Sequence, residues 1–249
     1  MRLDRFIANH KRVSAFQVRL LLAQRQVRVN GEVVCDGSRG LTEFCHVQLG
    51  AEILQERTPI YLMLHKPKGC VSAARDAQHL TLLDLIDPAL RPQLHLAGRL
   101  DFNTTGLVLL TNDGRWSRAL TEPQHKTPKT YWLQTQDVIT EDYVASFAQG
   151  MFFAYENLWT QPATLRILTP YTAELTLYEG RYHQVKRMFG RFNNEVLQLH
   201  RLAIGALKLD NTLAPGEYRA LTPAETHGIL AVRDGSLIDR LLLSGCVQR

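Results

Sequence analysis

Residues 95–114 read HLAGRLDFNTTGLVLLTNDG, and this stretch contains the clearest fold signal in the chain. The continuously apolar run at 107–110 predicts a strand that is covered on both faces of a sheet. Turn-forming residues bound this run on each side, at 103–106 and at 112–114. The pattern therefore predicts that Asp101 lies on a tight connection directly before a buried strand.

Asp101 is consistent with two different roles. A carboxylate that is held rigidly near a cation, here Arg99, stays ionised and can act as a nucleophile. The more common role of an aspartate in a turn is a hydrogen bond to its own backbone. The residue types alone leave both roles open.

The bulk composition is typical of a globular protein and excludes a disordered chain. The 249 residues are 45% hydrophobic and 21% charged, enough for one large domain or two unequal ones. The four cysteines have the spacing of neither a zinc site nor a disulfide framework, so we expect a reduced, cytoplasmic compartment. We also expect no signal peptide and no transmembrane segment, because no apolar run is long enough.

Positive charge is concentrated in the first 31 residues. This segment holds seven basic side chains and one acid, so it carries more positive charge than the chain total of +5. Such a block attracts polyphosphate partners and makes binding fall with salt, although a solvated helical face has the same composition. The basic residues that we expect to contact RNA here are Arg2, Arg5, Lys11, Arg12, Arg19, Arg25 and Arg28.

The N-terminal segment predicts a small unit of two helices and a hairpin. Helical spacing begins at Leu3, and Ser14 with Gln17 forms a capping box that begins a second helix. The Asn-Gly pair at 30–31 lies between β-branched runs, which is the strongest short hairpin signal. We therefore predict one domain at 1–58, a size at which small domains fold alone.

The remaining chain mixes strands and helices without a regular βαβ rhythm. This order favours the α+β class, with a large mixed, mostly antiparallel sheet flanked by helices, and a second domain at 59–230. No role is predicted for the C-terminal extension at 231–249. Expected strands lie at 60–64, 107–110, 129–133, 173–177 and 196–199, and expected helices at 81–87, 116–120, 140–149 and 183–192.

Two further segments contain candidate functional side chains. Tyr131 follows several basic residues on a predicted strand and could offer its ring to a nucleic acid base, although a half-buried strand tyrosine is the more common situation. The segment at 179–188 reads EGRYHQVKRM and concentrates positive charge at Arg181 and Lys186. A charged, solvated helix face is the alternative for this segment.

Taken together, these segments resemble the pseudouridine synthases, in the branch typified by the small-subunit rRNA enzyme. The N-terminal unit is similar to the S4 RNA-binding domain, a small α/β domain that is commonly fused to this branch. The resemblance extends over residues 1–225 and leaves the C-terminal extension without a counterpart. The matching motifs are KPKG at 66–69, GRLDFNTTGLVLLTNDG at 98–114, KTY at 129–131, EGRYHQVKRMFG at 179–190, LHR at 199–201 and LAPGEYR at 213–219.

The resemblance implies an enzyme that converts a specific uridine of 16S rRNA to pseudouridine after flipping the base. It implies that Asp101 attacks the nucleotide, at the ribose or at the ring, that Tyr131 lies against the target base, and that Lys186 is paired with Asp101. Arg99 and Arg181 are expected RNA contacts. The sequence has no nucleotide-binding or metal-binding fingerprint, so we expect neither a cofactor nor a metal.

The expected partner is rRNA or an assembling small ribosomal subunit, with the protein a cytoplasmic monomer that does not bind a membrane. One alternative is the same reaction on 23S rRNA. Another is a non-catalytic rRNA-binding or ribosome-assembly protein, although Asp101, Tyr131 and Lys186 within their motifs argue against it. A hydrolase built on Asp101 and a histidine would need a nucleophile elbow or paired carboxylates, and neither is visible.

Overall fold

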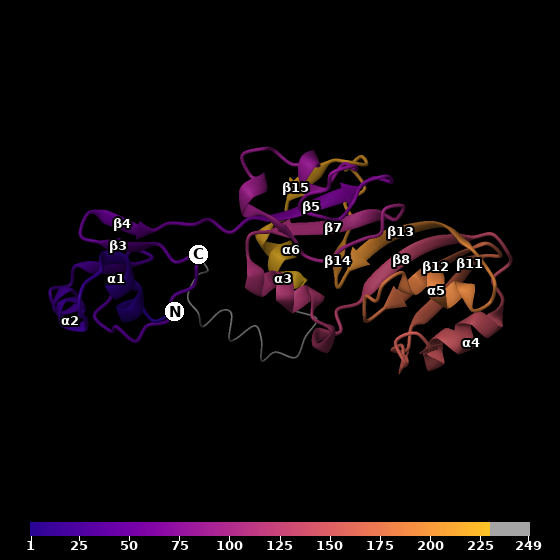
Figure 1. Cartoon of the computed structure of the whole chain (residues 1–249), viewed down its shortest axis with the longest axis horizontal. Coiled ribbons are helices and arrows are strands. Elements are labelled where there is room, and N and C mark those ends of the chain that lie inside the picture. The colour runs from indigo at the N-terminus through magenta and orange to yellow at the C-terminus, as the bar shows by residue number, and fades with distance from the viewer. Residues whose placement is uncertain (230–249) are drawn as a thin grey trace. The chain divides into compact units, whose positions relative to one another are not determined.

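The computed structural model describes residues 1–229 (Figure 1). The predicted C-terminal extension at 231–249 lies outside the described residues. The described chain forms two compact units, one at 1–59 and one at 60–229. No helix within the described residues is both long and apolar enough to span a bilayer.

The N-terminal unit packs two helices against a four-stranded sheet of order β2-β1-β3-β4. The predicted capping box is confirmed, because Ser14 and Gln17 each accept the other's backbone N–H with a side-chain oxygen. The hairpin is also confirmed, with φ values of 53° at Asn30 and 83° at Gly31. The elements are α1 (Leu3–Lys11), α2 (Ala15–Ala23), β1 (Val27–Val29), β2 (Glu32–Val33), β3 (Val47–Leu49) and β4 (Glu52–Gln55).

The larger unit is built on a nine-stranded sheet whose main path is β11-β12-β8-β13-β7-β5-β15 (Figure 1). The strand pairs of this sheet are antiparallel except for β13 with β7, which confirms the predicted α+β class and the mixed, mostly antiparallel sheet. Its strands are β5 (Tyr61–Lys66), β6 (His95–Leu96), β7 (Thr105–Thr111), β8 (Lys129–Thr135), β11 (Thr164–Thr169), β12 (Thr172–Leu177), β13 (Val196–Ile204), β14 (Leu207–Lys208) and β15 (Tyr218–Ala220).

Helices and one separate hairpin surround this sheet. The helices are α3 (Gly114–Thr121), α4 (Glu141–Gln149), α5 (Gln184–Gly190) and α6 (Pro223–Gly228), with 3-10 turns at Leu83–Leu85, Arg91–Gln93 and Pro123–His125. The hairpin, which no sequence signal indicated, consists of β9 (Phe152–Phe153) and β10 (Leu158–Trp159). The helix predicted at 81–87 is only a 3-10 turn, so that prediction was wrong in type and length.

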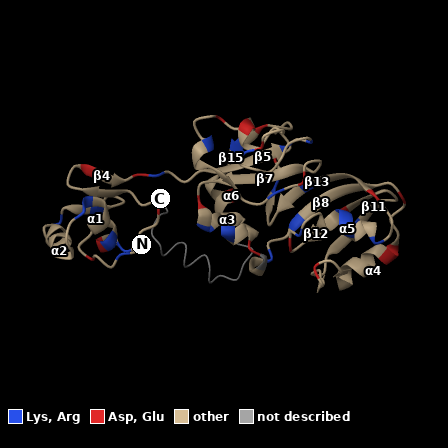
Figure 2. Ribbon diagram, viewed as in Figure 1, with Lys and Arg blue, Asp and Glu red and all other residues tan. Residues whose placement is uncertain are grey.

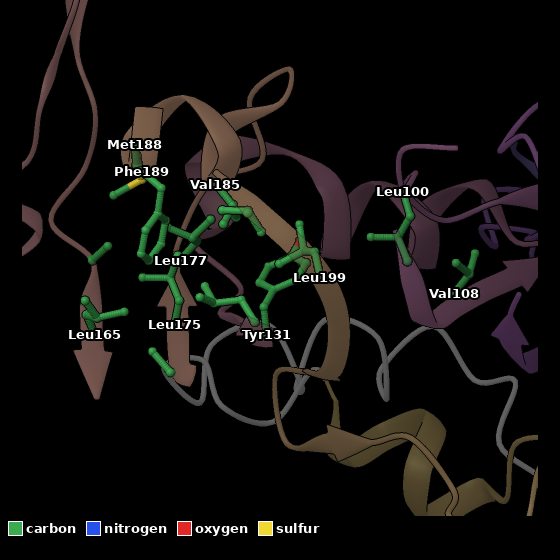
Figure 3. Packing of buried hydrophobic residues seen from close by; sticks show 14 of the residues in the cluster. Leu100, Val108, Tyr131, Leu165, Leu175, Leu177, Val185, Met188, Phe189 and Leu199 are labelled. Atoms are coloured by element: carbon green, nitrogen blue, oxygen red, sulfur yellow. The ribbon is translucent and has the colours of Figure 1, made fainter. Parts of the chain in front are cut away.

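Strand β7 is the centre of the larger unit. Leu107 and Leu109 pack in a cluster with Trp116 of α3, whereas Val108 and Leu110 pack in the opposite cluster, part of which Figure 3 shows. All four strand residues are fully buried. The prediction of a strand covered on both faces is therefore confirmed.

The parallel contact between β7 and β13 is unusually close at Gly106. Gly106 has φ +106° and lies opposite Arg201, and an added Cβ atom would be 2.3 Å from the Arg201 carbonyl oxygen. A glycine is required there both for the backbone conformation and for the approach of the two strands. This contact holds the segment that precedes β7, which contains Asp101, against β13.

Candidate active site

Asp101 lies in a tight turn directly before β7, as the sequence predicted. The Asp101 carbonyl oxygen accepts the Thr104 N–H at 3.1 Å, so the backbone itself closes the turn. The carboxylate is 29% exposed and lies 3.6 Å from Nε2 of His183. Within residues 1–229 this carboxylate makes no hydrogen bond to its own turn, so it is available to a ligand.

Lys66, the last residue of β5, holds this turn in place through hydrogen bonds to its backbone. Its side chain is fully buried, and its ammonium donates to three carbonyl oxygens. The acceptors are Pro67 at 3.0 Å, Phe102 at 3.1 Å and Thr104 at 2.9 Å. Because two of these carbonyls belong to residues that closely follow Asp101, Lys66 sets the backbone position from which Asp101 projects. The sequence identified the KPKG segment only by resemblance, since a contact spanning 38 residues leaves no local signal.

Replacing Lys66 tests this bracing role. We expect Lys66→Met to lower the free energy of unfolding by about 1–3 kcal/mol, because buried carbonyls lose their charged donor. We also expect kcat to fall at least about tenfold, since a displaced nucleophile reacts slowly. Denaturant unfolding and steady-state kinetics measure the two effects. The matched control is Lys68→Met, because Lys68 is exposed; equal losses in both variants would contradict the role.

The Lys66 ammonium also predicts a pH dependence. Burial lowers its pKa to about 8, although electrostatic interactions with Cys70 and Asp101 act in the opposite direction. Below pH 8 the lysine is protonated in both the folded and the unfolded chain, and the unfolded chain keeps the proton up to about 10.5. The desolvation cost is therefore present below pH 8, and Lys66's contribution to stability rises between these two values.

Activity should change in the opposite direction over this pH range. A neutral amine has two N–H donors for three carbonyls, so the turn loses one hydrogen bond as the pH rises above about 8. We expect kcat of the wild-type protein to decline there, and kcat of Lys66→Met to be low without that decline. Pre-steady-state rates across this range provide the measurement, and a flat wild-type profile would count against the assignment.

Arg201 on β13 is a second buried cation at this turn. Its Nε donates to the Leu107 carbonyl at 2.7 Å, and its Nη1 lies 3.5 Å from the Arg99 carbonyl. Its Nη2 is buried with no hydrogen-bond partner in the described chain, as is Oγ1 of Thr104. Arg201 therefore holds the backbone on both sides of Asp101 from β13, as Lys66 does from β5. No local sequence signal indicated this role.

Tyr131 is on β8, in the middle of the sheet. Its ring is only 8% exposed and belongs to the core cluster that also contains Val185, Leu175 and Leu199 (Figure 3). Its neighbours in the strand register are Leu175 on β12 and Arg201 on β13. Packing thus fixes the ring and leaves little of the residue exposed.

Lys186 is on α5, one turn after His183, and is partly exposed. It lines an open pocket of about 330 Å³ together with Gly190 and residues 193–196. Within residues 1–229 no carboxylate lies within ion-pair distance of Lys186, so the implied pairing with Asp101 is not formed in this structure. His183 takes that place because it precedes α5 in a left-handed conformation, with φ 49°, close to the carboxylate.

The basic residues that we expect to contact RNA differ in whether their side chains already bind another group of the protein. Arg99 is exposed, whereas Nε of Arg181 donates to the buried Glu179 at 2.8 Å. Figure 2 marks in blue the positions of the basic residues along the ribbon of the N-terminal unit. Of the seven basic residues expected to contact RNA within residues 1–31, three have partners in this unit: Arg2 with Asp4, Lys11 with Glu52 and Arg28 with the Gly31 carbonyl. The exposed side chains of Arg5, Arg12, Arg19 and Arg25 remain the strongest candidates for phosphate contacts.

Metal ligands do not cluster in the described chain. Among residues 1–229, no group of three or more His, Cys, Asp or Glu side chains could hold a metal ion.

Comparison with known proteins finds a match for each of the two units. A family model described as RNA pseudouridylate synthase matches residues 60–190, and an S4 domain model matches residues 1–43. Ribosomal small subunit pseudouridine synthase A of Pseudomonas aeruginosa is 52% identical over 226 residues, covering 90% of this chain and 98% of the relative. The protein of the same name from Haemophilus influenzae is 44% identical over 231 residues, covering 92% and 100%.

A solved structure agrees with these sequence matches. The crystal structure of a pseudouridylate synthase is 43% identical to this chain, with a TM-score of 0.68. The match covers 92% of this chain and 99% of the other. The likeness therefore includes both units and is not limited to the sheet.

Proposed function

This chain belongs to the RNA pseudouridylate synthase family, and from that premise we propose that it converts one uridine of small-subunit rRNA to pseudouridine with Asp101 as nucleophile. The relatives that cover almost the whole chain are named for the small ribosomal subunit. The observation that carries the role of Asp101 is its partly exposed carboxylate on a turn held by two buried cations, Lys66 and Arg201.

The reaction needs no net input of atoms. The bond between ribose C1′ and uracil N1 breaks, the uracil turns while it is held, and C5 forms a new bond to C1′. The proton on C5 is lost and N1 gains one. In the proposal, Asp101 bonds to the nucleotide during this exchange, either at the ribose or at the ring, and leaves unchanged at the end.

The residues around Asp101 would contribute mainly by fixing geometry. A rigid turn keeps the carboxylate oriented toward the nucleotide, which removes an entropic part of the barrier. His183 would contact the carboxylate, because its Nε2 lies 3.6 Å from Oδ1 of Asp101, and the proposed pairing of Lys186 with Asp101 would form in the complex with RNA. Tyr131 would limit where the detached uracil can move, because its ring is fixed by packing.

The target uridine must leave its stack to reach Asp101. Extrusion of a base costs a few kcal/mol, and least where the base is unpaired. We therefore expect a target in a loop or a loosened helix of the rRNA, where proteins can also read base edges. In this proposal the N-terminal unit docks on nearby phosphates.

Neutralising the N-terminal unit tests the docking role. We expect Arg5→Gln, Lys11→Gln and Arg12→Gln together to raise KM about tenfold and to change kcat little, because these residues belong to the N-terminal unit and Asp101 to the other. The plot of log affinity against log salt concentration should become less steep by about 2. Only Arg5 and Arg12 are counted in this change, since Lys11 is already paired with Glu52. The charge-matched control replaces the exposed Arg115, Arg118 and Lys208. An unchanged KM in the N-terminal variant would argue against docking.

Tritium release from rRNA that contains C5-labelled uridine tests the proposed function directly. We expect release from small-subunit rRNA or its assembling particle and none from large-subunit rRNA. Release from large-subunit rRNA alone would instead support the alternative substrate. Binding without release from any rRNA would support a non-catalytic ribosome-assembly protein.

A further inference from the structure

An exposed tyrosine lies beside the proposed nucleophile. Tyr182 stacks on His183, with ring centroids 3.9 Å apart and an angle of 19° between the planes. His183 in turn places Nε2 3.6 Å from Oδ1 of Asp101. The imidazole therefore touches both groups, with one face against the tyrosine and its edge toward the carboxylate.

Tyr182 is 74% exposed although it is held in place. An aromatic ring in solvent gains little from folding, so burial does not explain this conformation. The stack on His183 restricts the ring, and Nη1 of Arg187 approaches the Tyr182 carbonyl at 3.4 Å. The result is a flat aromatic surface that is already ordered before any ligand binds.

Arg187 also contacts the β9–β10 hairpin, whose turn contains a second exposed aromatic residue, Tyr155. Its guanidinium binds both carboxylate oxygens of Glu156 at 2.5 Å and lies 3.8 Å from the centre of the Phe153 ring. These contacts fix the turn of the β9–β10 hairpin next to α5. Tyr155, in that turn, is 97% exposed.

The surroundings match the chemistry of unpaired RNA. Single-stranded bases stack on aromatic side chains whatever their sequence, and cations beside the stack attract the phosphates. Arg181 and Lys186 flank Tyr182 and His183 along the chain and are at least partly exposed.

We propose that Tyr182, supported by His183, is a stacking platform for an unpaired nucleotide next to the target uridine in the RNA substrate, and that Tyr155 extends this surface. The proposal rests on the proposed function, because it assumes that the uridine reaches Asp101. Stacking the neighbouring nucleotide replaces a contact that the RNA loses when the uridine leaves its helix. Tyr182 is thus a binding residue, and it takes no part in bond making.

Substitution of Tyr182 separates stacking from other roles. On a small-subunit rRNA transcript we expect Tyr182→Ala to raise KM about tenfold while kcat stays within about twofold, as expected for one lost base–aromatic stack. Tyr182→Phe keeps the ring and should restore KM to within about twofold of wild type. The matched control is Tyr171→Ala, which removes a tyrosine that is 47% exposed in the turn between β11 and β12 and should change neither constant.

Filter binding of the same transcript distinguishes the two proposals. A wild-type protein that binds the transcript but never forms pseudouridine overturns the proposed function, and the Kd ratio of Tyr182→Ala to wild type still decides the stacking role. A ratio below about 2 overturns the platform. A loss in Tyr182→Phe equal to that in Tyr182→Ala also overturns it, because the hydroxyl and not the ring would then make the contact. A ratio near 10 that Phe restores supports the platform.

Discussion

Asp101→Asn is expected to reduce pseudouridine formation below about one hundredth of the wild-type rate, a loss of at least about 2.7 kcal/mol of transition-state stabilisation. An amide oxygen is a poor nucleophile, so the covalent step is lost. The turn itself should remain intact, because it is closed by the Asp101 carbonyl and held by Lys66. Single-turnover assays of tritium release measure the rate, and filter binding should give a Kd within about twofold of wild type.

An exposed acid elsewhere in the same unit provides the control for this substitution. Asp137→Asn removes the same charge from an exposed turn of the same unit, and its activity should be unchanged. Residual activity of Asp101→Asn above one hundredth would contradict a nucleophilic role. A loss of folding, detected by circular dichroism, would show instead that the carboxylate is needed by the turn.

The parts of the fold that the sequence predicted correctly depend on local signals. The capping box of Ser14 and Gln17, the Asn-Gly turn at 30–31 and the apolar run at 107–110 each determine a structure within a few residues of themselves. The β9–β10 hairpin escaped prediction because its two strands have only two residues each. Its position depends on the contact of Arg187 with Glu156, which are 31 residues apart.

The candidate site was predictable only where a motif marked a residue. Asp101 is marked by the turn and the strand that follow it. Lys66 and Arg201 act through backbone carbonyls that are distant in the sequence, and no pattern of residue types reveals such a contact. The left-handed conformation of His183 is equally invisible, since residues other than glycine rarely adopt it. The resemblance implies Lys186 as the partner of Asp101 because of its position in the motif, and the side chain that the structure brings within ion-pair distance of Asp101 is His183.

Gly106→Ala is expected to lower the free energy of unfolding by about 3–5 kcal/mol, because it combines a strained backbone with an overpacked core. The new Cβ atom would meet the Arg201 carbonyl oxygen at 2.3 Å and its backbone nitrogen at 2.5 Å. Both are backbone atoms of a central strand, so they cannot move away as a flexible side chain would. Denaturant unfolding followed by circular dichroism measures the loss.

Gly180→Ala is the matched control for that substitution. Gly180 lies in the same unit, and no atom lies within 4 Å of the position where its Cβ would be. Its stability should change by less than about 1 kcal/mol. If Gly106→Ala were equally mild, β7 and β13 could separate without cost, and the backbone around Asp101 would not depend on their contact. A large loss of stability in Gly106→Ala alone means that the pairing of β7 with β13 supports the Asp101 turn. Arg201 reaches the Leu107 and Arg99 carbonyls only while the two strands are in contact.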